Sequence, residues 1–168
     1  MSLVKRIISA AVNEINKPTS FVKGEEFERY VETTMFPREK YQIVRKTQDY
    51  NSNKNGYVED SLKPDFHFRC LETNKEFAIE AKFRNSKYNK HDRITWCNPE
   101  QLKRYQAFNK KIRTFIVLGL GDSAKNPEEV FIFPVSATKF TELYDSFLDM
   151  YSFYVGKPVF SGYLWKLG

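Results

Sequence analysis

The chain has few cysteines and no long apolar run. Its 168 residues include two cysteines, Cys70 and Cys97, which are too few for a disulfide framework and favour a reducing, cytoplasmic compartment. No apolar stretch approaches the roughly 20 residues that a membrane-spanning helix needs. The only presequence candidate, residues 3–12, is short and lacks a cleavage-type site, so it is better explained as an amphipathic helix. We therefore expect a cytoplasmic protein without a membrane partner.

Internal repeats and low-complexity segments are also lacking. A single domain of this length buries about two-thirds of the surface that its unfolded chain exposes, so it needs no disulfide or metal to fold. We expect one domain over residues 1–168 with its core at about 23–135. A helix over 3–15 and a C-terminal part over 138–168, made of a helix and an aromatic tail, are expected as additions to that core.

Acidic residues are scarce in one segment. Residues 81–114 hold ten basic and two acidic side chains, a net charge of +8, whereas the whole chain carries +6. Neutralising phosphates and releasing their counterions supplies most sequence-independent affinity for nucleic acids, so this segment predicts a polyanionic partner. The residues predicted to bind nucleic acid are Arg84, Lys87, Lys90, Arg93, Lys103 and Arg104. A solvated, lysine-rich surface is the alternative.

Hydrophobic periodicity predicts alternating helices and strands. The expected elements are helices over 3–15 and 23–36, a strand over 41–47, a hairpin over 63–82, a helix over 98–111, strands over 114–120 and 129–135, and a helix over 138–151. Asn98, Pro99 and Gln101 suit the N-cap, first and third positions of their helix. The polar run 48–63 predicts a long loop that contacts substrate, and 83–97 a basic loop with a bent strand.

The hairpin over 63–82 brings charged residues together. Because side chains alternate faces along a strand, Glu80 and Lys82 share one face, opposite Phe77 and Ile79. Asp65 opens the first strand and faces them across the pair. Two carboxylates and a lysine are therefore expected to converge at one end of a small sheet.

Two converging carboxylates stay ionised together only if a cation compensates their repulsion. Oxygen ligands select hard ions such as Mg²⁺, which polarise phosphate and lower the pKa of an attacking water. Lys82, beside Glu80, would orient that water or offset charge on the phosphoryl oxygens. The alternative is a structural ion pair between Glu80 and Lys82, and exposed pairs contribute under about 1 kcal/mol.

A zinc site is a weaker interpretation. His67, Cys70, His91 and Cys97 form a two-His, two-Cys set, but His67 and Cys70 lie on opposite faces of one strand and cannot easily share an ion. His67 lies on the Asp65 face, where two roles stay open: lining the charged site, or forming an ordinary hydrogen bond within the sheet.

Pro64-Asp65, followed after fourteen residues by Glu80-Ala81-Lys82, resembles the motif of the PD-(D/E)XK nuclease superfamily. Two further matches lie outside the hairpin. Lys23-Gly24 with Glu28-Arg29 is similar to the first-helix motif of archaeal Holliday-junction resolvases and restriction-enzyme relatives, and Gln101 with Tyr105 is similar to the Gln-x-x-x-Tyr motif of nuclease domains in bacterial recombination helicase-nucleases.

The resemblance implies an α/β fold with a restriction-endonuclease-like, three-layer core in which helices flank a central mixed β-sheet. It also implies the roles of the site residues. Asp65, Glu80 and the Ala81 carbonyl would hold Mg²⁺, for which Mn²⁺ substitutes, and Lys82 would assist the water. Glu28 would bind a second ion or a metal-bound water. Gln101 and Tyr105 would support the site or contact the scissile phosphate.

The expected function is a metal-dependent nuclease that hydrolyses DNA, most simply an endonuclease, without a small-molecule cofactor. An exonuclease module of a helicase complex and a non-catalytic binding module remain alternatives, and RNA is not distinguished from DNA. Glu59 and Asp60 are rival acids, but Asp65 opens a strand and is preferred. The aromatic tail is expected to pack in the core or at a homodimer interface, ahead of stacking on bases.

Overall fold

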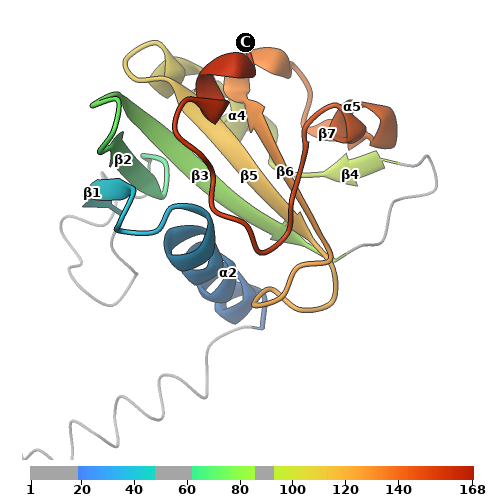
Figure 1. Ribbon diagram of the computed structural model, residues 1–168. Coiled ribbons are helices and arrows are strands. Elements are labelled where there is room, and N and C mark those ends of the chain that lie inside the picture. Colours follow the sequence, from blue (N-terminus) through green and yellow to red (C-terminus); the bar gives the residue numbers. More distant parts are fainter. Residues whose placement is uncertain (1–18, 48–61, 86–92) are drawn as a thin grey trace, which may run out of the picture.

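The computed structural model describes residues 19–47, 62–85 and 93–168 (Figure 1). The elements are α2 (Thr19–Tyr30), a π-helical turn (Val31–Met35), β1 (Tyr41–Lys46), β2 (Phe66–Cys70), β3 (Glu76–Arg84), β4 (Arg93–Thr95), α4 (Pro99–Asn109), β5 (Thr114–Leu120), β6 (Glu129–Pro134), a 3-10 turn (Val135–Ala137), β7 (Glu142–Tyr144), α5 (Asp145–Asp149), β8 (Ser152–Phe153) and a 3-10 turn (Tyr163–Lys166). The predicted helix over 3–15 and most of the predicted loop over 48–63 lie outside the described residues. Within them, no helix is both long and apolar enough to cross a membrane.

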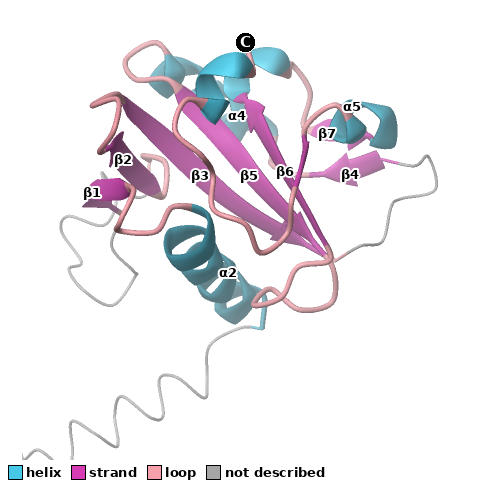
Figure 2. Cartoon of the chain, viewed as in Figure 1, coloured by secondary structure: helices cyan, strands magenta, loops and turns pink. Residues whose placement is uncertain are grey.

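Six strands form the central sheet in the order β1-β2-β3-β5-β6-β8 (Figure 2). β3 and β5 run parallel, and the neighbouring pairs on either side are antiparallel. The predicted mixed sheet is therefore confirmed, as is the hairpin that places β2 beside β3. The helix α4 connects β3 to β5 by way of β4, because a parallel pair needs a long crossover.

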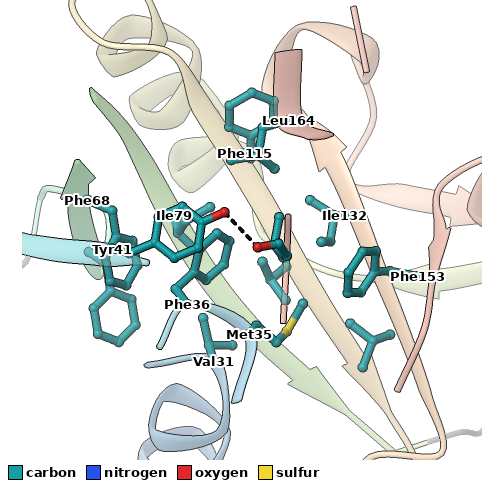
Figure 3. Close-up of a cluster of buried hydrophobic side chains, with 14 of the residues drawn as sticks. Val31, Met35, Phe36, Tyr41, Phe68, Ile79, Phe115, Ile132, Phe153 and Leu164 are labelled. Carbon is teal, nitrogen blue, oxygen red and sulfur yellow. Dashed lines mark hydrogen bonds between the residues drawn. The ribbon is translucent and has the colours of Figure 1, made fainter. Parts of the chain in front are cut away.

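Helices lie on both faces of the sheet, which completes three layers. β5 is buried along its whole length, as its continuous apolar run predicts. Phe115 and Val117 belong to the core on the α2 side, whereas Ile116 and Leu118 belong to the core on the α4 side. Figure 3 shows part of the α2-side core, in which the Tyr41 hydroxyl donates a 2.7 Å hydrogen bond to the Val159 carbonyl. The predicted fold class is confirmed.

A glycine allows α2 to approach the sheet. A Cβ atom at Gly119 of β5 would lie 2.3 Å from the Phe27 ring of α2, far inside van der Waals contact. Phe27 is fully buried and packs against Phe83 of β3, with ring centroids 5.6 Å apart. The missing side chain at Gly119 thus sets the depth at which α2 lies over the end of β3.

The helix predicted over 138–151 is wrong. Residues 142–144 form β7, which pairs with β4, and only Asp145–Asp149 is helical. Trp96 explains the difference, because its indole donates to the Phe140 carbonyl at 2.9 Å and its backbone N–H donates to the Thr141 carbonyl at 3.0 Å. These bonds hold the chain extended alongside β4. Tertiary pairing overrides the helical periodicity of the segment.

The C-terminal tail completes the core instead of lying outside it. β8 pairs with β6 at the edge of the sheet, and Val159 and Leu164 are buried on the α2 side. The Val159 N–H donates to the Met35 carbonyl at 2.8 Å, and the Trp165 ring lies 6.3 Å from that of Phe115. Of the two roles expected for the tail, packing in the core is the one that these contacts show.

Candidate active site

The charged residues of the hairpin meet where β3 extends past its neighbour. The last pair between the strands joins Phe66 to Ile79, so the stretch from Glu80 onward has no β2 partner, although it still pairs with β5. At this open edge the Asp65 carboxylate accepts a 2.8 Å hydrogen bond from the Ala81 N–H. The Asp65 side chain takes the place of the β2 carbonyl that would otherwise accept from the Ala81 N–H, because a buried backbone donor needs a partner.

Glu80 is held by two donors on a single oxygen. Its Oε1 accepts a 2.7 Å ion pair from Lys82 Nζ and a 2.6 Å hydrogen bond from the hydroxyl of Tyr105 in α4. The residue is only 5% exposed. Glu80 and Lys82 share one face of β3, as predicted. This face is turned toward α4, whose buried Tyr105 lies over them.

A small cavity of about 230 Å³ opens at this edge. Its lining residues are Ser20, Phe21, Gly24, Glu25, Glu28, Asp65, Glu80, Ala81, Lys82, Phe83 and Arg84. The helix α2 supplies Glu28 from one side, and β3 supplies Glu80 and Lys82. The structure thus brings together five of the predicted site residues around one cavity, and Tyr105 joins them through Glu80.

The electrostatics of the cavity place acids and one base in close contact. Burial, followed by the Glu80 and Glu28 carboxylates, raises the pKa of Asp65 well above its ordinary value, and Lys82 and the Ala81 N–H only partly oppose this. Burial alone would lower the pKa of Lys82, but the Glu80 and Asp65 carboxylates outweigh it and raise that pKa. Lys82 is therefore a cation, and it shares the cavity with Asp65, Glu80 and Glu28.

The donor atoms fit a hard divalent cation. Within the residues that the structure describes, Asp65 Oδ1 and Glu80 Oε2 accept no hydrogen bond, since Ala81, Lys82 and Tyr105 all use the other oxygen of each carboxylate. No three Asp, Glu, His or Cys side chains of the described chain gather into a ready-made metal cluster. A site with few carboxylates suits Mg²⁺, which keeps several waters.

Gln101 lies at the start of α4 and not at the carboxylates. Its N–H donates to Asn98 Oδ1 at 2.8 Å, and its amide oxygen accepts from the Asn98 N–H at 3.1 Å. The predicted capping box is therefore confirmed. These hydrogen bonds cap the start of α4 and do not reach Glu80, so a direct role of Gln101 in the site stays a prediction.

The basic residues differ in what they contact. Arg84 donates to the carbonyls of Phe83, Thr95 and Trp96 at 2.6 to 3.0 Å, so it ties β4 to the cavity. Arg93 lies over the Tyr144 ring, 4.4 Å from its centroid. Of the other residues predicted to bind nucleic acid, Lys103 is exposed and Arg104 half-buried, and Lys87 and Lys90 lie outside the described residues, like Glu59 and Asp60.

Two residues that line the cavity were not predicted as part of the site. Ser20 and Phe21 line it, and the expected helix began after them. The signal for an earlier start is Pro18-Thr19-Ser20, a proline followed by good N-cap residues. His67, in contrast, bonds to Glu76 at 2.7 Å, which favours the ordinary hydrogen-bonded histidine of a sheet. Among the described residues no metal-binding set gathers around His67, and His91 lies outside them.

Comparisons with known proteins show similarity to solved structures. No protein-family model matches the chain, and the search of curated proteins found no match. Among solved structures, the chain is similar to Hjc, a Holliday junction resolvase from the archaeal hyperthermophile Archaeoglobus fulgidus. The sequence identity is 15%, the match covers 76% of this chain and 93% of that one, and the TM-score is 0.46.

Proposed function

We propose that the chain is a metal-dependent nuclease that hydrolyses phosphodiester bonds of DNA and cuts within the strand. One observation carries the proposal: Asp65, Glu80 and Lys82 converge on a cavity at an open sheet edge, and donors among the described residues bind only one oxygen of each acid. The spacing and order of these residues are those that the resemblance to PD-(D/E)XK nucleases implies.

Asp65, Glu80 and the Ala81 carbonyl would hold Mg²⁺ or Mn²⁺, and Glu28 would bind a second ion or a metal-bound water. Such an ion supplies polarisation of the phosphate and a lower pKa for water when bound. The chain's own residues do the rest. Tyr105 and Lys82 fix the orientation of Glu80, and Lys82 presents a cation to phosphoryl oxygens on which charge develops.

Burial favours this interpretation over a structural ion pair. The Glu80 and Lys82 side chains are 6% and 15% exposed, so both lose most of their hydration on folding. A buried ion pair adds little to stability compared with apolar residues of the same volume. Functional sites typically hold buried charged groups with shifted pKa values. Glu80 and Lys82 are such buried groups, and the pKa of Asp65 beside them is raised.

DNA is proposed as the substrate because of the charge of the chain. The chain carries a net charge of +6, which its basic segment over 81–114 supplies, and two cations of that segment, Lys82 and Arg84, line the cavity. A sequence-independent contact with phosphates follows from this arrangement.

Cleavage of supercoiled plasmid tests the proposal. The wild type is expected to nick the plasmid with Mg²⁺ or Mn²⁺ and to be inactive with a chelator, whereas Asp65→Ala, Glu80→Ala and Lys82→Ala lose activity. Activity on a closed circle supports internal cutting, and activity on linear DNA alone supports the exonuclease alternative. Cleavage that persists in all three variants would contradict the proposal. DNA binding without any cleavage would favour the non-catalytic module.

A further inference from the structure

A second hollow, which we name the aromatic groove, lies beside the β4–β7 pair. Its volume is about 520 Å³, and it is lined by Arg93, Ala137, Thr138, Lys139, Phe140, Glu142, Leu143, Tyr144 and Phe147. Figure 1 shows this pair of strands to the right of the main sheet, away from α2. The side chains of Phe140 and Tyr144 are 72% and 49% exposed. Two large rings therefore face water, where they contribute little to folding.

The backbone beneath these rings is fixed. The Phe140 N–H donates to Thr138 Oγ1 at 3.3 Å, and the Phe140 carbonyl accepts from the Trp96 indole at 2.9 Å. Tyr144 belongs to β7 and is held by Arg93, whose guanidinium bonds to its hydroxyl and covers its ring. The exposed rings are thus presented on rigid supports, which lowers the entropy lost when a flat ligand stacks on them.

The aromatic groove is connected to the candidate active site by one buried residue. Arg84 lines the cavity and donates to the Trp96 carbonyl at 2.6 Å, and the Trp96 indole holds Phe140. Along β4, Thr95 bonds to Arg84 and Arg93 lines the groove, and two residues of a strand span about 7 Å. Arg84, Trp96 and β4 therefore form a continuous set of contacts between the cavity and the groove.

We propose that the aromatic groove binds an unpaired base of the DNA strand whose phosphate lies at the candidate active site. This inference rests on the proposed nuclease function and adds a substrate class, DNA with a single-stranded or opened region next to the cut. Any base can stack on an aromatic ring or on the plane of an arginine. The groove would therefore select unpaired bases without distinguishing one base from another.

Charge favours a nucleic acid over a peptide or a second copy of the chain as the occupant. Lys139 is exposed at the rim, Arg93 lies over one ring, and the single acid of the lining, Glu142, lies 3.5 Å from Arg93. The groove therefore combines stacking surfaces with cations that suit the phosphates on either side of a base. Its volume lies in the range of ordinary ligand pockets and admits a base with part of its sugar.

Binding without catalysis tests the inference. With a chelator present, the affinity of the wild type for a short oligothymidine is compared with that for an abasic oligomer of the same length and charge. The oligothymidine is expected to bind at least about fivefold more tightly, as stacking of one base implies. Phe140→Ser and Tyr144→Ser are expected to remove that preference and to leave the affinity for the abasic oligomer unchanged.

Tyr154→Ser is the matched control, because Tyr154 is 80% exposed and does not line the groove. It is expected to keep the preference. Equal affinity of the wild type for both oligomers would overturn the inference, as would groove variants that weaken both oligomers equally. A third outcome would assign the groove to a second copy of the chain. In it, the wild type shows no base preference and sedimentation shows concentration-dependent dimers that Phe140→Ser abolishes. The binding experiment measures no cleavage. A missing base preference would therefore not contradict the nuclease proposal, and a missing cleavage activity would not prevent interpretation of the binding result.

Discussion

The hydroxyl of Tyr105 lies 2.6 Å from Glu80 Oε1, and it approaches that oxygen from α4 while Lys82 approaches it from the same strand. A helix that begins after the active-site strand thus fixes the orientation of a carboxylate in the cavity. The bond also explains the direction of the Tyr105 pKa, which burial and then the Glu80 charge raise far above its ordinary value, so the phenol remains a donor.

Removing this hydroxyl should weaken activity through Glu80. In Tyr105→Phe the carboxylate keeps Lys82 alone, and losing a partner that orients a ligand typically costs about 10- to 100-fold in activity or metal affinity. The ring still packs against Trp96, with centroids 5.9 Å apart. Cleavage rates, measured at several Mg²⁺ concentrations beside thermal unfolding, check the prediction. Wild-type rates in a folded Tyr105→Phe protein would contradict it.

Gln101 should matter to the helix and not to the chemistry. Gln101→Glu keeps a side chain that closes the capping box, so its unfolding free energy and cleavage rate are expected to match the wild type. Gln101→Ala loses the bond to the Asn98 N–H and is expected to lose about 1 kcal/mol of stability. Urea unfolding and cleavage are measured on both variants. A large loss of cleavage in Gln101→Glu would give Gln101 a role in the site itself.

Two glycines of the site region should respond oppositely to alanine. Gly119→Ala forces a methyl group against Phe27 and is expected to lower the unfolding free energy by about 1–3 kcal/mol. At Gly24, in α2, an added Cβ meets nothing within 4 Å, so Gly24→Ala is expected to raise it by about 0.5–1 kcal/mol. Urea unfolding measures both. Equal stabilities for the two variants would show that Phe27 does not lie against Gly119.

The stability of the chain should depend on pH through Glu32. Burial tends to raise the pKa of Glu32, but Lys46 at 2.7 Å and Arg38 at 3.5 Å outweigh it and lower the pKa below 4.5. A carboxylate whose pKa is lower in the folded protein than in the unfolded chain stabilises the fold at pH values above its unfolded-state pKa. That stabilisation is lost as the pH falls through its folded-state pKa. Glu32→Gln is therefore expected to be less stable at pH 7 by up to about 1 kcal/mol.

The difference between Glu32→Gln and the wild type should shrink as the pH falls below 4.5, because the carboxylate of the wild type then becomes neutral. Urea unfolding at a series of pH values checks this. A difference that stays constant through the acid range would show that the substitution acts through packing and not through charge.

Much of the site could be predicted from the sequence because its geometry is local. A two-residue period places Glu80 beside Lys82, and a hairpin brings Asp65 across from them. The capping pattern at Asn98 fixed the start of α4, and with it the turn on which Tyr105 lies. None of these inferences required knowledge of how distant segments pack.

The predictions that failed depended on distant contacts. The periodicity of residues 138–151 suits a helix, but Trp96, more than forty positions earlier, binds the backbone of Phe140 and Thr141. The contacts of Arg84 also depend on distant packing, because two of the three carbonyls to which it donates belong to Thr95 and Trp96, at and just after β4. The aromatic groove arises from the same packing, so no local pattern indicated it.

The central claim is that Asp65 and Glu80 hold the divalent ion that cleavage requires. Calorimetric titration of Mn²⁺ into the wild type and into Asp65→Asn, a substitution that preserves shape and removes the charge, tests it most directly. Saturable binding to the wild type that is lost in a folded Asp65→Asn protein is the predicted result. Binding of equal affinity and stoichiometry to both proteins would contradict the account, since the ion would then lie elsewhere than at the open edge of β3.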